Sequence, residues 1–264
     1  MVPQALLFAL FAVFGLAIGS FLNVCSDRLP GGRSIVRPPS TCAACNHRLR
    51  ARDLVPLFSF LWLRGRCRYC RTPIPRRIPA LEVAMGVVFS LLYWHHGLSL
   101  ELVFPLLYAS LFALIFIIDI EHQLILDKVV FPGMGLALIF SLFNPALDYP
   151  ALGTGIALRP AISIAGGAAG LVIMLLPFLI SRGGMGLGDV KMAALIGLIA
   201  GFPKVFIALF LAIMAGGLVA VALLALGLAK RRQPIPFGPF LAAGAMTVVV
   251  WGAEIQNFYQ QIIT

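Results

Sequence analysis

Charged residues are scarce in this sequence: they make up 11% of its 264 residues, and only ten residues are acidic. Soluble chains carry roughly 25% charged residues and about 45–50% apolar ones, whereas this chain is 61% hydrophobic. This composition excludes an ordinary soluble domain. It indicates a chain whose apolar runs cross the ~30 Å hydrocarbon core of a bilayer.

The N-terminus lacks the features of a cleaved signal peptide. Met1 to Gln4 contains no basic residue before the apolar run that extends to Val24, and no small-residue cleavage site precedes a soluble domain. We therefore expect residues 1–24 to form a retained first span.

Eight apolar segments predict an all-α, polytopic membrane protein. They cover residues 4–24, 79–95, 102–118, 129–147, 161–181, 190–202, 205–229 and 239–254. The second contains Glu82, the sixth is short and the eighth is rich in Gly and Ala, so six or seven spans are the alternatives. A short segment can be tilted, re-entrant or enclosed by its neighbours.

The basic residues are not spread as they would be over a nucleic-acid-binding surface. If the N-terminus lies outside the cytoplasm, 18 of the 20 Lys and Arg fall in or beside four cytoplasmic segments, and only Arg159 and Lys204 do not. These segments are 25–78, 119–128, 182–189 and 230–238. The positive-inside rule predicts this orientation and accounts for the net charge of +10 without a nucleic-acid partner. We expect the basic residues to serve anionic lipid headgroups more than substrate.

Cysteine is also rare, with five residues, but four of them form two Cys-x-x-Cys pairs 21 residues apart: Cys42 with Cys45, and Cys67 with Cys70. This spacing is typical of a tetrahedral structural Zn²⁺ site. Two disulfides, a redox relay or free thiols are the alternatives, and the first two suit an oxidising compartment rather than the cytoplasm. Basic neighbours (Arg66, Arg68 and Arg71) should favour the thiolate form. Cys25 stands alone and is expected to be a small buried hydrophobe.

The segment 25–78 is the only sizeable extramembrane part, and it is too small for a substantial core of its own. A bound zinc ion would stabilise the fold of this segment. The sequence thus predicts three parts: a first span (1–24), a cytoplasmic zinc-binding loop (25–78) and a transmembrane core (79–264).

Two of the few acidic residues lie at span ends that face the cytoplasm in this orientation. Asp119 ends the third apolar segment and Asp189 begins the sixth. Ionisable groups at such places are costly and are functional candidates. Two adjacent carboxyl groups share a proton and can hold a water for general acid–base chemistry. Each alone could instead be a helix cap.

Glycines precede the second carboxylate, in the run Gly186-Leu187-Gly188-Asp189. We expect Gly186 and Gly188 to adopt positive φ, to let a substrate strand or the other Asp approach closely, and to leave N–H groups free at a helix start.

This run also matches the Gly-x-Gly-Asp motif of membrane aspartic proteases. The segments that resemble bacterial type IV prepilin peptidases follow the same order along the whole chain: 19–24, 28–30, 56–60, the two Cys-x-x-Cys pairs, 78–82, 118–124, 183–191 and 234–239. The chain is therefore similar to that family from its first span to its last.

The resemblance implies a bacterial inner-membrane endopeptidase that cleaves the basic leader of prepilins or pseudopilins at the cytoplasmic face. By position, Asp119 and Asp189 would be the catalytic pair. Members with the tetracysteine loop also methylate the new N-terminus with S-adenosylmethionine, which would place that activity in the 25–78 loop.

Three points stay open in the sequence. Asp127 is a rival to Asp119, because the family's Leu-Pro-Asp reads Ile125-Leu126-Asp127 here. Glu82 could pair with Arg76 or Arg77, or contact the amino group of the cofactor. No nucleotide-binding glycine pattern locates the cofactor.

Three other functions are compatible with parts of the pattern. An ion- or proton-coupled transporter could use the same Asp pair, a thiol oxidoreductase could use the four cysteines, and a structural assembly protein would use neither.

Overall fold

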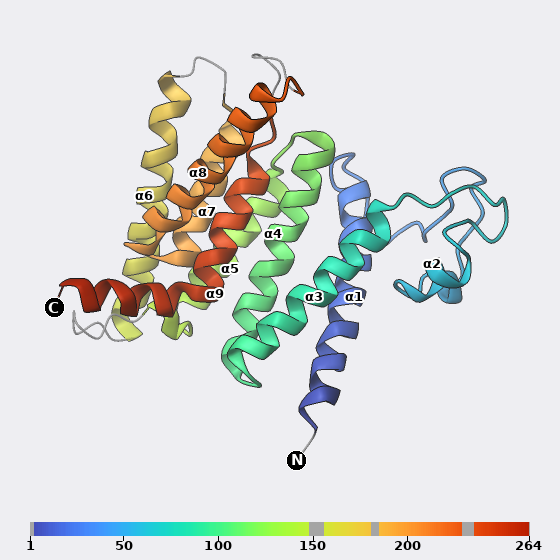
Figure 1. Cartoon of the computed structure of the whole chain (residues 1–264), viewed down its shortest axis with the longest axis horizontal. Helices are drawn as coiled ribbons and strands as arrows, with labels where there is room; N and C mark the ends of the chain where they lie inside the picture. The colour runs from blue at the N-terminus through green and yellow to red at the C-terminus, as the bar shows by residue number, and fades with distance from the viewer. Residues whose placement is uncertain (1–2, 148–155, 181–184, 229–234, 264) are drawn as a thin grey trace. The chain divides into compact units, whose positions relative to one another are not determined.

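The computed structural model is helical throughout the residues that it describes, which are 3–147, 156–180, 185–228 and 235–263 (Figure 1). Extended pairing in these ranges is limited to two isolated bridges, Thr41 with Arg48 and Arg66 with Pro73. The all-α prediction is confirmed.

Within the described residues, five helices are long and apolar enough to cross a membrane. They are α1 (Gln4–Arg28), α3 (Arg77–His96), α4 (Val103–His122), α6 (Arg159–Ile180) and α8 (Lys204–Ala225). Three further helices have a shorter apolar stretch: α5 (Asp127–Ser141), α7 (Leu187–Ala200) and α9 (Gly238–Ile263). The backbone of α9 is non-helical at Trp251. Each of the eight predicted segments falls on a helix, so the chain is a multi-pass membrane protein. The count of eight spans stays a prediction.

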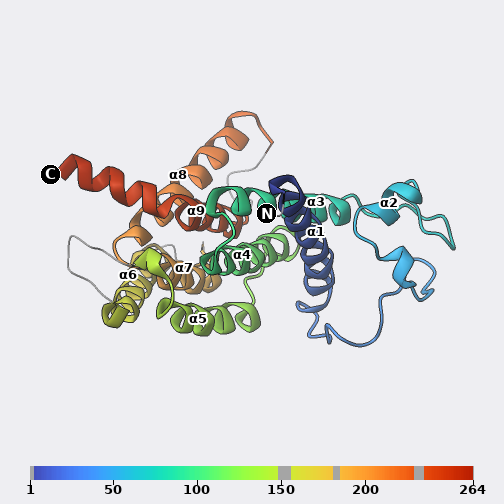
Figure 2. The same ribbon diagram turned by 90° about the horizontal axis from the view of Figure 1, so that it is seen from below.

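The chain forms two compact units, Met1–Leu114 and Ile115–Thr264, with the boundary inside α4. The functional division at residues 24 and 78 stays a prediction. In the first unit α1 and α3 pack along each other (Figures 1 and 2). Any side chain at Gly15 would overlap the Met85 carbonyl, and one at Gly19 would lie 2.7 Å from the Glu82 Cα. Glycines four residues apart thus allow two apolar helices to approach closely, as is common between membrane helices.

In the second unit, α7 is enclosed by its neighbours. It packs against α5, α6, α8 and α9, and Met192, Ala193 and Leu195 are completely buried. A side chain at Gly166 of α6 would overlap the Gly197 carbonyl of α7. This enclosure explains how a helix of only 14 residues is tolerated among membrane spans.

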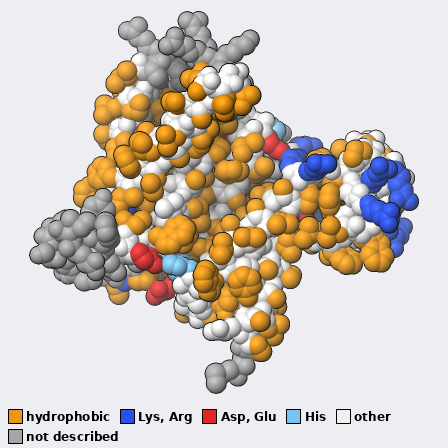
Figure 3. All heavy atoms as spheres, in the orientation of Figure 1, with side chains coloured by type: hydrophobic (Ala, Val, Ile, Leu, Met, Phe, Trp, Pro, Cys, Tyr) orange, Lys and Arg blue, Asp and Glu red, His pale blue; other side chains and the backbone are white. Residues whose placement is uncertain are grey.

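Hydrophobic side chains cover much of the face of the molecule that Figure 3 shows. Large hydrophobic side chains stay exposed along α1, such as Leu10 and Val13, and along α8, such as Phe210, Leu218 and Val221. A soluble protein does not expose apolar surface on this scale. These faces are expected to contact lipid.

Candidate active site and metal centre

Asp119 lies in the last turn of α4 and is 5% exposed. The helix ends because Gln123 takes a positive φ of 53° while its N–H still bonds the Asp119 carbonyl at 2.9 Å. This αL residue is a common helix terminator. Asp119 is thereby held one turn inside a rigid helix rather than on the following loop.

The backbone of Gly238 holds the Asp119 side chain. Its N–H, at the first position of α9, donates to Asp119 Oδ2 at 2.9 Å. A Cβ at position 238 would lie 2.6 Å from the same oxygen, so this contact requires glycine. The unpaired N–H groups and the dipole of a helix N-terminus both favour a carboxylate at this place.

Asp189 is the third residue of α7 and is half-buried. Asp119, 70 positions earlier in the sequence, belongs to the same unit and is near enough for its charge to act on Asp189. The approach of these two carboxylates to each other stays a prediction. Their catalytic role is not tested by this geometry alone.

The two glycines before Asp189 do not act as expected. Gly186 has φ −77° and ψ 141°, and Gly188 lies inside α7, so the prediction of positive φ was wrong. For Gly188 the reason is space: its Cβ would lie 2.8 Å from the Cβ of Ile125. Gly188 therefore lets the start of α7 lie against the segment between α4 and α5.

Asp127, the rival carboxylate, has a partner of its own. It opens α5 and accepts two hydrogen bonds from Lys191 Nζ of α7, at 2.7 and 2.9 Å. The same ammonium group lies 5.5 Å from the ring centre of Phe131. The contacts join α5 to α7 and leave Asp127 half exposed, which favours a structural role for it.

The four cysteines of the first unit meet at one point. Their sulfur atoms lie within 4.8 Å of one another, and those of Cys42 and Cys70 are 3.8 Å apart. A tetrahedral ion with Zn–S bonds of about 2.3 Å separates its sulfurs by about 3.8 Å. The four residues could therefore hold a metal ion, and their geometry fits Zn²⁺.

The two cysteine pairs adopt the same local structure. The N–H of Cys42 bonds the His47 carbonyl at 3.0 Å, and the N–H of Cys67 bonds the Thr72 carbonyl at 2.8 Å. The residue after each second cysteine, Asn46 or Arg71, has positive φ. Two equivalent tight turns thus direct four sulfurs to one centre.

Hydrogen bonds favour the thiolate at two of the four cysteines, whereas burial and the neighbouring thiols raise the pKa of Cys45 to about 11. The backbone N–H of Cys45 lowers the pKa of Cys42, and the Thr72 hydroxyl, 3.3 Å from Cys70 Sγ, lowers the pKa of Cys70 to about 6. The expected cause, the charge of nearby arginines, is not the main one. Arg68 instead pairs with Asp53 at 2.6 Å.

Glu82 is 5% exposed. Its Oε2 accepts the backbone N–H of Leu57 at 2.7 Å, and Arg77, one of its expected partners, pairs with Asp27. The hydrogen bond ties the loop to α3 and holds Leu57 at a positive φ of 57°. Contact with a cofactor stays a prediction for Glu82.

A cleft of about 690 Å³ opens beside the cysteine cluster, within the first unit. Negatively and positively charged side chains both line the cleft. The carboxylates belong to Asp27, Asp53 and Glu82, and the guanidinium groups to Arg28, Arg33, Arg68 and Arg77. The lining thus offers groups of both charges to a small polar ligand. Small-molecule sites are concave and place a few polar groups in this way.

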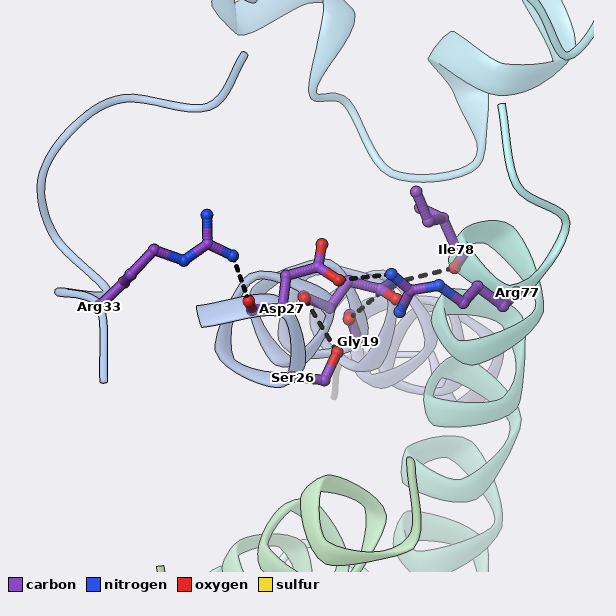
Figure 4. A network of polar contacts seen from close by, with 7 residues as sticks. Gly19, Ser26, Asp27, Arg33, Arg77 and Ile78 are labelled. Atoms are coloured by element: carbon purple, nitrogen blue, oxygen red, sulfur yellow. Dashed lines mark hydrogen bonds and ion pairs between the residues drawn. The ribbon is translucent and has the colours of Figure 1, made fainter. Parts of the chain in front are cut away.

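Polar contacts fix α1 against the start of α3 at this cleft (Figure 4). Asp27 pairs with Arg77, and its carbonyl accepts Arg33 Nη2 at 2.5 Å. Asn23 donates to the carbonyls of Gly19 and Ile78 at 3.2 and 3.1 Å. The network sets one wall of the cleft before any ligand binds.

Two contacts were not predicted from the sequence: Gly238 to Asp119, and Lys191 to Asp127. The segment 234–239 resembled a family motif, but this resemblance gave Gly238 no role. Its Phe-Gly-Pro sequence at a helix start was the available signal, since it suggests a residue chosen for close approach.

Two family models match the chain. Residues 13–96 match the bacterial peptidase A24 N-terminal domain, and residues 106–221 match the type IV leader peptidase family. Among curated proteins, the prepilin leader peptidase/N-methyltransferase of Bacillus subtilis is 32% identical, with 94% of this chain and 95% of the relative covered. The protein of that name from Pseudomonas putida is 33% identical, with 96% and 94% covered. No solved structure matches the chain.

Proposed function

The chain belongs to the type IV leader peptidase family, and we propose that it is an aspartic endopeptidase of the bacterial inner membrane that uses Asp119 and Asp189. Its substrates would be prepilins or pseudopilins, whose leader peptides it removes at the cytoplasmic face. The observation that supports the proposal is the electrostatic influence of Asp119, in the last turn of α4, on Asp189, in the first turn of α7, within the second unit.

The chemistry follows from the pairing. Two neighbouring carboxyl groups do not both ionise easily, so they share one proton and can hold a water between them. The ionised member takes a proton from that water as it attacks the scissile carbonyl, and the protonated member donates to the carbonyl oxygen. Gly238 engages Asp119 Oδ2, which leaves Oδ1 as the oxygen available to the water.

We propose that the N-terminus of the chain lies outside and that the Asp pair faces the cytoplasm. The distribution of Lys and Arg supports this orientation. The two carboxylates also lie at helix ends, in the last turn of α4 and the first turn of α7. A substrate can reach that depth from one side without crossing the bilayer, whereas the transporter alternative expects the site near the midplane.

The first unit would hold the second activity, N-methylation of the new N-terminus. Cys42, Cys45, Cys67 and Cys70 would hold a structural Zn²⁺ that fixes the loop beside the cleft. Bound S-adenosylmethionine would supply the methyl group, with the carboxylates of the cleft facing its cationic groups and the arginines its carboxylate. Glu82 would stabilise the cleft through Leu57 and is the candidate for the cofactor's amino group.

The test is a reaction of the purified chain in nanodiscs with a prepilin and isotope-labelled S-adenosylmethionine. Mass spectrometry of the product should show a pilin without its leader that carries one labelled methyl group. Cleavage without methylation would contradict only the proposed methyltransferase activity. An unchanged prepilin would contradict the whole proposal.

A further inference from the structure

The loop carries an apolar surface next to the cysteine cluster. It runs from Leu54 to Trp62 and includes helix α2 (Phe58–Trp62). Phe58, Leu61 and Trp62 are 59%, 64% and 72% exposed. The rings of Phe58 and Trp62 stack with their centres 5.8 Å apart. Such side chains, adjacent on a loop outside the long helices, are not accounted for by a structural zinc site or by peptidase chemistry.

The same loop is strongly basic. Residues 25–78 contain twelve arginines against two aspartates and no other acidic residue, a net charge of +10. Both aspartates are already paired, Asp27 with Arg77 and Asp53 with Arg68. Figure 3 shows Lys and Arg side chains over the outer side of this lobe and hydrophobic side chains along its lower edge. Figure 1 places α2 at that edge, the side toward which α1 and α3 extend.

The hydrogen bond from Leu57 to Glu82 fixes the depth of this surface. Glu82 lies five residues into α3, which begins at Arg77. At 1.5 Å per residue, this places the attachment point about 7 Å along the span from its basic end. Amphipathic segments that lie in a membrane interface insert their apolar side by ~5–10 Å. The two depths agree.

We propose that residues 54–62 insert into the interface of the bilayer that the helices cross and anchor the metal-binding loop on it. The aromatic and leucine side chains would lie at the boundary between headgroups and acyl chains, where Trp is favoured. The surrounding arginines would lie among anionic headgroups. The anchor would hold the cleft at the membrane surface, where the polar end of a membrane-inserted substrate would lie. This inference does not depend on the proposed reactions.

The experiment uses the full chain in nanodiscs, with Trp62 as the probe. Trp94→Phe and Trp251→Phe remove the other two tryptophans. The matched control carries Trp62→Phe and Val36→Trp instead, because Val36 lies on the same loop outside the apolar surface and is 77% exposed. Fluorescence quenching is measured with iodide, which stays in water, and with lipids that carry a spin label near the headgroup.

Trp62 should be quenched by the labelled lipid and protected from iodide several-fold relative to the Val36→Trp control. Replacing phosphatidylglycerol with phosphatidylcholine should weaken that protection, because the arginines then lose their anionic partners. Equal iodide quenching at both positions would overturn the proposal. Protection of Trp62 that arises only when a prepilin is added would overturn it in favour of a substrate-docking surface.

Discussion

The backbone N–H of Gly238 donates a hydrogen bond to Asp119 Oδ2 at 2.9 Å, and a Cβ on residue 238 would lie 2.6 Å from that oxygen. The start of α9 thus fixes one carboxylate of the pair through a contact that only glycine permits. Asp119 is only 5% exposed, so other atoms surround the side chain that Gly238 contacts.

Gly238→Ala is therefore expected to lower cleavage sharply with little loss of expression. The new methyl group must push the Asp119 carboxylate aside, and a misplacement of about 1 Å at a reacting group can cost ~100-fold in rate. Initial rates of prepilin cleavage measure the effect. Gly217→Ala is the control, because a Cβ there meets nothing within 4 Å. Equal rates for both variants would contradict the role of Gly238.

The contact of Gly188 with Ile125 gives a second prediction. Gly188→Ala should reduce cleavage, because its Cβ would lie 2.8 Å from the Ile125 Cβ and would displace the start of α7 with Asp189. Combining it with Ile125→Gly removes the opposing atoms and should restore part of the rate. A double variant no better than Gly188→Ala would show that the clash is not the cause.

The ion pair between Asp127 and Lys191 should matter for stability more than for catalysis. Asp127 is about half exposed, and exposed pairs contribute ~0.2–1 kcal/mol. Asp127→Ala is thus expected to lower the melting temperature slightly and to slow cleavage by less than about fivefold. The charge-reversed double variant Asp127→Lys with Lys191→Asp should recover the melting temperature.

The Thr72 hydroxyl should make the cysteine cluster release its metal at a lower pH than it would without that hydroxyl. A metal displaces thiol protons, so its affinity falls as the pH drops through the thiol pKa. Because the Thr72 hydroxyl lowers the pKa of Cys70 to about 6, proton competition at this thiol begins near that pH rather than near ~8.5, the range of an ordinary thiol. Thr72→Val removes the hydroxyl and should shift zinc release to higher pH.

Zinc release is followed with a chromophoric chelator as the pH is lowered. Cys25→Ala is the control, since Cys25 is buried in α1 away from the cluster, and it should leave the release curve unchanged. Zinc release at the same pH in the wild type and in Thr72→Val would show that the Thr72 hydroxyl does not lower the pKa of Cys70.

The sequence alone was sufficient to predict the helical fold class. It was also sufficient to select the candidate residues that stand out by their spacing or by their charge within an apolar segment. The cysteines could be found because their spacing is fixed within each turn, and Asp119 and Asp189 because charges are costly in apolar segments. The hydrogen bond of Gly238 to Asp119 joins residues 119 positions apart. That of Leu57 to Glu82 depends on how the loop folds back onto α3. Neither follows from composition or periodicity.

The span count shows the same limit. Hydropathy finds each apolar segment, but it does not distinguish α7, a 14-residue helix that is mostly buried from Val190 onward, from a helix that contacts lipid. Burial of α7 depends on the glycines of α6, such as Gly166, which allow close packing. That packing becomes visible only in the fold.

The most direct measurement is prepilin cleavage in membranes by the wild type and by Asp119→Asn, Asp189→Asn and Asp127→Asn. Each substitution keeps the size of the side chain and removes its charge. The first two variants should leave the prepilin uncleaved, because either one destroys the shared proton and the bound water, while Asp127→Asn should still process it. Cleavage by Asp119→Asn or Asp189→Asn at the wild-type rate would contradict the assignment of the Asp pair as the catalytic centre.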